Sequence, residues 1–80
     1  MPASPTQRLD GLEAGAICHL LEIGGPRAFR RRLMELGLLP GASVRVLRRV
    51  AVGGLVELEV RGARVSMRLS EAADVTVELA

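Results

Sequence analysis

A regular alternation of apolar and polar residues in the last third of the chain is the feature that most constrains its fold. In three short stretches every second residue is aliphatic, and these residues are Val56, Leu58 and Val60, then Val65, Met67 and Leu69, then Val75, Val77 and Leu79. Successive side chains of a β-strand point to opposite faces of the sheet. The pattern therefore predicts three antiparallel strands that each bury one face.

The first two of these strands are predicted to form a hairpin. A two-residue turn at 61–62 (Arg-Gly) would place Glu59 opposite Arg64 and Leu58 opposite Val65, so that charge and burial agree in one register. After the second strand, Ser70 has the side chain of an N-cap residue, and a short helical turn is expected over residues 70–73.

Two further strands are predicted upstream. Residues 16–23 alternate, with Cys18, Leu20 and Glu22 on one face, and the strand ends at Gly-Gly-Pro, residues 24–26. Residues 43–50 form another strand, in which the alternation fails at Leu47 and indicates a bulge.

Residues 27–36 are predicted to form one helix between these strands. Phe29, Leu33 and Leu36 have the i, i+4, i+7 spacing of a single helix face, and Gly37 follows where a helix often ends in a left-handed residue. Five short strands with one apolar face each close best into a small barrel. The fold class predicted is all-β, an SH3-like barrel with one α-helix inserted after the first strand.

Length and composition indicate one small domain. The chain has 80 residues, and we assign residues 9–80 to the domain and the Pro/Ser/Thr/Gln-rich residues 1–8 to a flexible N-terminus. Cys18 is the single cysteine, so no intrachain disulfide is possible, which suits a reducing compartment. The sequence has neither an apolar run of membrane-spanning length nor the start of a signal peptide, and it predicts a cytoplasmic protein without membrane insertion.

A dedicated metal or catalytic site is not expected. Cys18 and His19 are neighbours in a predicted strand and point to opposite faces, so they can neither chelate one ion together nor act as a nucleophile with its base. They are weak candidates for an adventitious divalent ion only, and no cofactor is predicted. Nucleotide-binding loops of the GxxxxGK[ST] or GxGxxG type are absent, and we do not expect an enzyme.

Positive charge is concentrated in the middle of the chain. Residues 27–49 hold seven arginines and one glutamate, a net charge of +6, whereas the segments before and after it each carry −2. Such a cluster could contact phosphates. Small barrels that bind single strands also stack bases on aromatic side chains, but the only aromatic residue here, Phe29, lies on the core face of the helix.

A protein-binding surface is the interpretation we favour for this region. Exposed methionine and leucine side chains beside arginines are typical of interfaces. The predicted surface joins the outer face of the helix to the following turn and consists of Arg27, Arg30, Arg31, Met34, Leu38 and Leu39.

The sequence resembles the FeoA family over residues 9–79. The resemblance rests on residues 33–41 (LMELGLLPG), Val44 with Val46, residues 65–72 leading into 75–77, and residues 9–12 with Gly15. The chain departs from the family pattern at Met67, where a leucine is usual before Arg68, and at residues 51–54 (AVGG), where the family often has a proline and a Gly-Asp-Pro segment.

This resemblance implies an SH3-like fold and a small cytoplasmic accessory protein of bacterial ferrous-iron uptake. The implied partner is FeoB, a membrane transporter with a cytosolic GTPase domain, which the chain would modulate by protein–protein contact as a monomer or weak homodimer. The module is also similar to the C-terminal domain of metal-dependent repressors of the diphtheria-toxin-repressor type, but this chain has no helix-turn-helix. Two alternatives stay open: a small barrel that binds nucleic acid, and a ferrous-metal sensor that uses Cys18 or His19.

Overall fold

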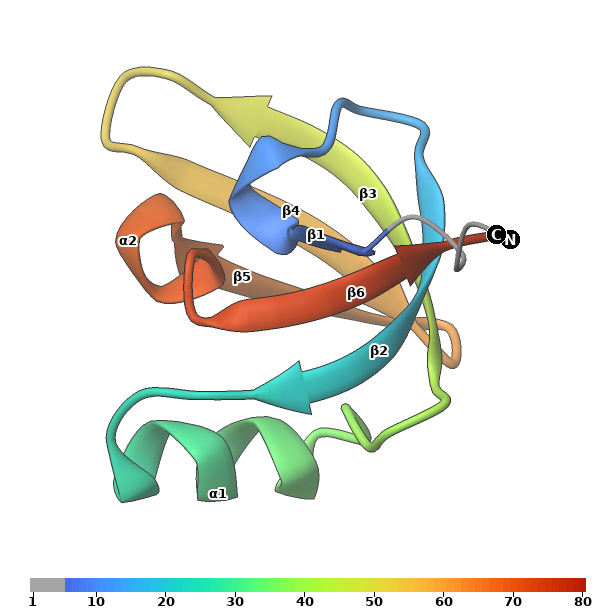
Figure 1. Ribbon diagram of the computed structural model, residues 1–80. Coiled ribbons are helices and arrows are strands. Elements are labelled where there is room, and N and C mark those ends of the chain that lie inside the picture. The colour runs from blue at the N-terminus through green and yellow to red at the C-terminus, as the bar shows by residue number, and fades with distance from the viewer. Residues whose placement is uncertain (1–5) are drawn as a thin grey trace.

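Six antiparallel strands form one curved sheet in the computed structural model, which describes residues 6–80 (Figure 1). The strands lie in the order β1-β6-β2-β3-β4-β5. The elements are β1 (Thr6–Arg8), the 3-10 helix η1 (Leu9–Gly11), β2 (Ile17–Ile23), α1 (Arg27–Glu35), β3 (Ser43–Val50), β4 (Leu55–Val60), β5 (Ala63–Arg68), α2 (Leu69–Ala72) and β6 (Val75–Leu79). The predicted all-β, SH3-like fold with an inserted helix is confirmed.

The sheet contains one strand more than the five predicted. Thr6–Arg8, which we assigned to the flexible N-terminus, forms β1 and pairs with β6, with Gln7 opposite Val77. All three of its side chains are exposed, so the strand leaves no apolar alternation in the sequence. The prediction for residues 1–5 lies outside the described residues.

The hairpin of β4 and β5 has the predicted register. Glu59 lies opposite Arg64 and Leu58 lies opposite Val65. At the turn, Arg61 has φ 53° and Gly62 has φ 81°. Two successive residues with positive φ are the signature of the type I′ turn, whose twist matches that of the strands it joins.

The short helix α2 begins one residue earlier than predicted. It starts at Leu69, so Arg68 is its N-cap and the assignment of that position to Ser70 is wrong. A side chain of the helix itself stabilises its start instead. The Arg68 backbone N–H donates a hydrogen bond to Glu71 Oε1, with nitrogen and oxygen 2.9 Å apart.

Two strands carry irregularities of register. The bulge predicted at Leu47 is confirmed, since the pairing of β3 with β4 shifts between Val46 and Arg48. A second shift lies in β2, between Leu20 and Glu22, and the sequence does not signal it. Because of that shift Glu22 is exposed and does not share the inner face with Cys18 and Leu20 as predicted.

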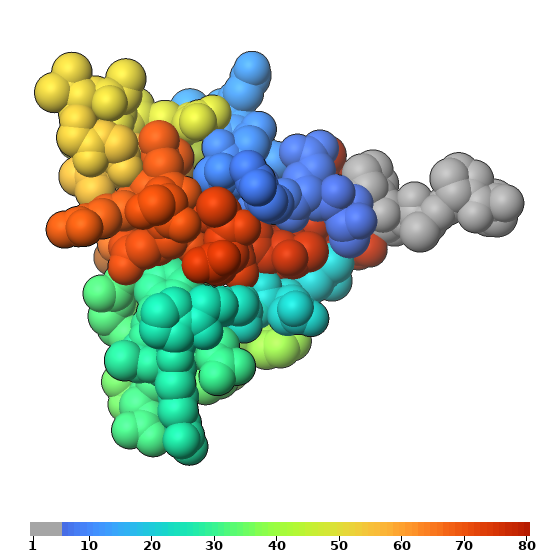
Figure 2. All heavy atoms as spheres, turned by 60° about the vertical axis from the view of Figure 1, so that its left-hand side comes forward, coloured from blue at the N-terminus to red at the C-terminus, as the bar shows by residue number. Residues whose placement is uncertain are grey.

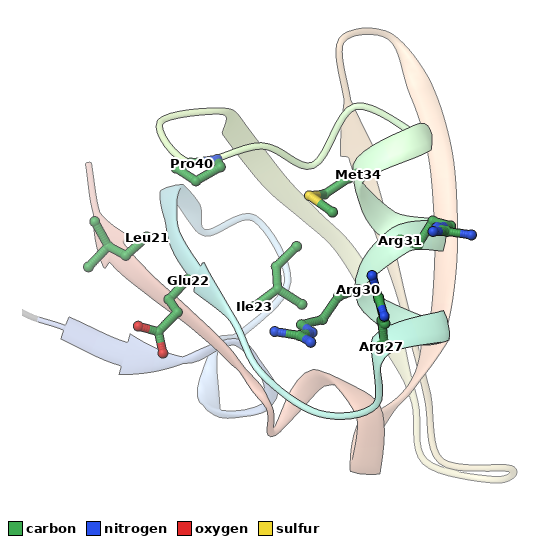
Figure 3. A pocket seen from close by; sticks show the side chains of 8 residues that line it. All are labelled: Leu21, Glu22, Ile23, Arg27, Arg30, Arg31, Met34 and Pro40. Carbon is green, nitrogen blue, oxygen red and sulfur yellow. The ribbon is translucent and has the colours of Figure 1, made fainter.

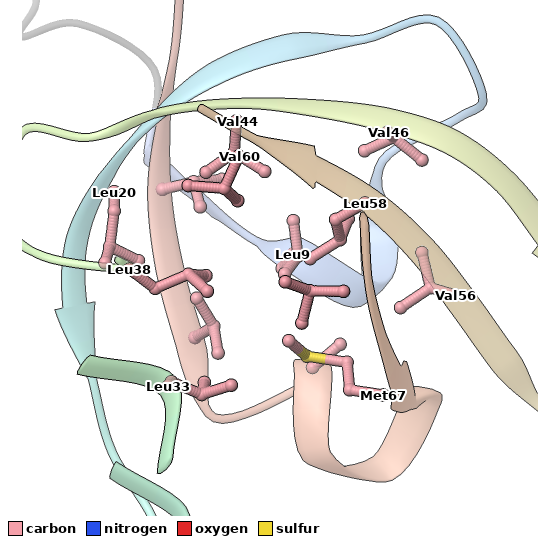
Figure 4. Packing of buried hydrophobic residues seen from close by; sticks show 14 of the residues in the cluster. Leu9, Leu20, Leu33, Leu38, Val44, Val46, Val56, Leu58, Val60 and Met67 are labelled. Atoms are coloured by element: carbon pink, nitrogen blue, oxygen red, sulfur yellow. The ribbon is translucent and has the colours of Figure 1, made fainter. Parts of the chain in front are cut away.

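One apolar cluster fills the inside of the curved sheet (Figure 4). Every strand except β1 contributes to it, together with η1, both α-helices and residues 12 and 38. The helices η1 and α2 pack against each other where the two end strands of the sheet, β1 and β5, are not paired. Within residues 6–80 this core contains no buried polar or charged residue. None of the described helices is long and apolar enough to cross a membrane.

Candidate partner-binding groove

The helix α1 is attached to the sheet by a tightly held link at its start. The Gly24 N–H donates a hydrogen bond to the Asp74 carbonyl oxygen at 2.7 Å. Gly25 has φ 82°, and a Cβ atom added there would lie 2.9 Å from the Asp74 carboxylate. Pro26 then caps the helix, whose inner face buries Phe29 and Leu33. This link fixes where α1 begins relative to the start of β6.

The other end of α1 is closed by a Schellman motif. Gly37, at φ 99°, donates its N–H to the Met34 carbonyl oxygen at 3.0 Å, and Leu38 donates to the Leu33 carbonyl oxygen at 2.9 Å. The motif turns the Leu38 side chain back beside Leu33, and both are fully buried. Leu38 is therefore a core residue, and its assignment to the partner-binding surface is wrong.

Leu36 was predicted in the core but is exposed. The helical spacing predicts it on the core face, but it follows the last residue of α1 and its side chain is 47% exposed. The place that Leu36 would fill is taken by Leu38, which the Schellman motif brings back to the core.

An open groove of about 460 Å³ runs between α1 and β2 (Figure 3). Its lining comprises Leu21, Glu22, Ile23, Arg27, Arg30, Arg31, Met34 and Pro40. Four residues of the predicted surface, the three arginines and Met34, are thus brought together here. Leu39 is 43% exposed in the adjoining turn but does not line the groove.

The sequence did not predict the residues on the β2 side of the groove. Leu21, Glu22, Ile23 and Pro40 were not predicted as functional residues, and they line the groove because β2 runs alongside α1. The alternation predicts Leu21 and Ile23 on the strand face that does not carry Cys18 and Leu20, but the register shift places Ile23 opposite Val75, where it packs against the core. Nothing in that alternation indicated that a helix would lie beside it.

The groove arginines are free of intramolecular ion pairs within the described part of the chain. The three salt bridges found in residues 6–80 join Arg8 to Asp10, Arg32 to Glu71 and Arg48 to Glu57. Glu22 is the only acidic residue that lines the groove, and it lies on the β2 side. The α1 side of the groove is therefore basic, and its three arginines form no ion pair within residues 6–80.

Arg32 differs from its neighbours because its side chain makes contacts within the protein. Its guanidinium lies 5.6 Å from the centre of the Phe29 ring, within cation–π range, and 3.5 Å from the Glu71 carboxylate of α2. The side chain thus covers the buried ring and links the two helices. It is not available to the groove.

Cys18 and His19 lie on opposite faces of β2, as predicted. The Cys18 side chain is fully buried, and its Sγ donates a hydrogen bond to the Val44 carbonyl oxygen at 3.6 Å. Burial raises the pKa of this thiol to about 11. His19 is exposed on the outer face, across from Glu78 of β6. In the part of the chain that the structure describes, no three His, Cys, Asp or Glu side chains gather in one place.

The arginines of β3 form a separate group. Arg48 and Arg49 lie at the end of β3 next to the loop 51–54, on the opposite side of the molecule from α1 (Figures 1 and 2). The only aromatic side chain, Phe29, is 8% exposed. The arginines of the +6 segment are therefore spread over the molecule, with Arg45 opposite Glu59 near the start of β3, and none of them lies beside an exposed aromatic side chain.

A family model described as the FeoA domain matches residues 7–79. The chain belongs to the FeoA family. FeoA proteins are associated with ferrous-iron transport, and neither the FeoA domain nor the SH3-like domains most similar to it are enzyme families. A search of curated proteins gives no significant match.

Solved FeoA structures share this fold along most of the chain. The FeoA protein from Chlorobium tepidum is 37% identical, with a TM-score of 0.87, and the match covers 91% of this chain and 70% of that one. A second structure, an iron uptake regulatory protein (FeoA), is 26% identical with a TM-score of 0.83, and the match covers 95% of this chain and all of that one.

The similarity extends to a class of larger proteins. A manganese-dependent transcriptional repressor matches with a TM-score of 0.88 at 20% identity, over 100% of this chain and 45% of the repressor. At that identity the match establishes only that the repressor contains a domain of the same SH3-like fold.

Proposed function

We propose that this FeoA protein is a cytoplasmic accessory protein of ferrous-iron uptake that binds the cytosolic part of a FeoB-type transporter. Contact is made through the groove between α1 and β2 and modulates the transporter's GTPase domain or pore. The proposal rests mainly on one open groove that brings together exposed apolar side chains and three arginines with no ion-pair partner in residues 6–80. Family membership supplies the link to iron transport.

The composition of the groove matches that of a protein interface. Met34 is 47% exposed and lies on α1 with the groove arginines, and Leu21 is 39% exposed on the β2 side of the groove. Methionine and arginine are enriched in the buried centres of interfaces, where a few such residues supply most of the binding energy. A partner that covers the groove would remove these side chains from water and gain free energy in doing so.

The two alternative functions draw less support from the same residues. Nucleic-acid binding would use stacked bases, whereas Phe29 is buried beneath Arg32. A ferrous-metal sensor would use Cys18 or His19, whereas Cys18 is fully buried and, within residues 6–80, no group of three His, Cys, Asp or Glu side chains that could hold a metal includes either residue.

Binding of the purified chain to the isolated cytosolic domain of the transporter tests the proposal. Isothermal titration calorimetry should give saturable binding, and the double variant R30E/R31E should weaken it at least about tenfold, because it reverses charges at the groove. The control R48E/R49E makes the same formal change of charge away from the groove, on two adjacent arginines at the end of β3, where it also removes the Arg48–Glu57 ion pair. It should bind like the wild type.

Two results would contradict the proposal. Undiminished binding by R30E/R31E would show that the docking surface lies elsewhere, and absence of binding by the folded wild type would exclude this partner domain. Light scattering in the same experiment tests the expected monomer or weak homodimer.

A further inference from the structure

We infer that the groove between α1 and β2 receives a short acidic segment that carries one large apolar side chain. The inference rests on the proposed function, since it specifies which kind of segment of the partner makes the contact.

The floor of the groove is apolar and adaptable. Ile23 projects from β2 and Met34 projects from α1 into the space between these elements, with Pro40 at one end (Figure 3). An unbranched methionine side chain adjusts to differently shaped apolar partners. A leucine-sized side chain that enters between Ile23 and Met34 would bury both of them.

The basic side of the groove favours carboxylates. Arg30 extends from α1 toward β2, whereas Arg31, which also lines the groove, points away from Ile23 (Figure 3). Neither arginine, nor Arg27, has an ion-pair partner within residues 6–80. Guanidinium groups bind carboxylates through charge-assisted, often bidentate hydrogen bonds. Arg30 is accordingly the residue best placed to hold an acidic side chain over the apolar floor.

The position of Glu22 determines how an acidic segment is oriented in the groove. Glu22 lines the β2 side of the groove across from α1, and its carboxylate lies on the side of β2 away from the arginines (Figure 3). An acidic occupant would be repelled by Glu22 and attracted by Arg30, so its carboxylates lie toward α1. Removal of the Glu22 charge should therefore strengthen binding.

The size of the groove limits the occupant to a few residues. The nine residues of α1 span about 13 Å at the rise of an α-helix. About four residues of extended chain cover that length. The volume of about 460 Å³ lies within the range of sites that enclose a small number of side chains.

The concave shape favours a peptide over a lipid surface. An anionic bilayer would also attract arginines, but it inserts apolar side chains that project outward. Here Ile23 and Met34 form the floor of a groove, and Ile23 is partly buried. Among residues 6–80 the most exposed large apolar residue is Val52, at 89%, and it belongs to the loop 51–54, at the far end of the molecule from α1.

A titration of the isotope-labelled protein followed by two-dimensional NMR tests the inference, because this method detects weak binding and locates it. The probe is an acetylated peptide of about five residues in which one leucine is flanked by glutamates, matched to the length of the groove. It should shift the signals of Ile23, Arg30 and Met34. A peptide with serine in place of the leucine, and one with glutamines in place of the glutamates, should each bind at least about fivefold more weakly.

Variants of the protein then assign the contacts. R30Q should lower the affinity for the glutamate–leucine peptide more than R31Q, M34S should lower it as well, and E22Q should raise it. R48Q/R49Q is the control and should have no effect. The two altered peptides are tested on the wild-type protein, so the result does not depend on the folding of any variant.

Three outcomes would overturn the inference. They are equal binding of the serine peptide, equal binding of the glutamine peptide, or binding of phosphatidylglycerol vesicles that R30Q abolishes. The test is separable from that of the proposed function. If the peptide fails while the transporter domain binds in an Arg30-dependent way, the inference is wrong and the function stands; if only the peptide binds, the assignment of the transporter is wrong.

Discussion

Arg61 occupies a backbone conformation that suits other residues better. Among residues 6–80 it is the only non-glycine residue with a positive φ, 53°, and it precedes Gly62 in the type I′ turn between β4 and β5. Asparagine and glycine populate this region readily, whereas arginine pays a steric cost. The Arg61 side chain lies close to the end of α1, since its Cδ is 3.8 Å from where a Cβ atom on Gly37 would be.

Replacement of Arg61 by asparagine should stabilise the protein. The Arg61→Asn variant should raise the free energy of unfolding by about 0.5 to 1 kcal/mol, because asparagine–glycine is the preferred pair for this turn. Urea denaturation measures the change. Arg64→Asn is the control, since Arg64 is exposed in the same hairpin but sits in extended β5, and it should give no gain. A loss of stability in Arg61→Asn would show that packing against the end of α1 outweighs the backbone preference.

Cys18 couples the core to pH. Burial raises the pKa of its thiol from 9.0 to about 11, so the folded protein keeps the proton that the unfolded chain releases first. The stability contributed by the protonated thiol is fully present below pH 9 and is lost as the pH rises from 9 toward about 11.

The free energy of unfolding should therefore fall over that alkaline interval. Urea denaturation at several pH values should show a smaller fall in Cys18→Ala, which lacks the thiol. At about pH 8 the native thiol should also resist alkylating reagents, because reaction requires an accessible thiolate. Rapid labelling of the folded protein at that pH would contradict the burial on which the prediction rests.

At the scale of elements, α1 depends on few contacts. Its inner face gives only Phe29 and Leu33 to the core, and Leu38 joins them from beyond the helix end. The Arg32–Glu71 ion pair is exposed and contributes little. The docking of α1, and with it the shape of the groove, is held mainly by these three apolar side chains.

Substitution of a buried and an exposed leucine in this region tests whether apolar contacts hold α1 in place. Leu33→Ala should lower the free energy of unfolding by about 2 to 4 kcal/mol, since it removes buried methyl groups and leaves a cavity. Leu36→Ala should change it by less than about 0.5 kcal/mol, because Leu36 is exposed. Thermal denaturation of the two variants measures both changes in stability. Equal losses would mean that Leu36 returns to the core face that the helical spacing predicts.

The sequence predicted elements whose signal is local and failed where the outcome depends on distant partners. Period-two alternation and turn chemistry sufficed for the register of the β4–β5 hairpin and for the bulge at Leu47. The exchange of Leu36 for Leu38 in the core depends on how the end of α1 meets the sheet. Likewise β1 exists only because β6 offers it a free edge. The groove was predicted only in part for the same reason. The helical pattern of α1 predicted its arginines and Met34 as surface residues, whereas the β2 residues of the groove are recognised only in the folded structure.

For the molecule as a whole, one apolar cluster joins almost every element, and this has a consequence for unfolding. Leu33 of α1 and Cys18 of β2 belong to the same cluster. A small domain with a single core unfolds in one cooperative step, so α1 should not detach before the sheet opens. Loss of far-UV circular dichroism and exposure of the Cys18 thiol, followed across a urea gradient, should have one midpoint. Leu33→Ala should shift both measurements equally. A midpoint for thiol exposure that stays unchanged in Leu33→Ala would show that α1 is a separate unit, and the groove would then open and close independently of the barrel.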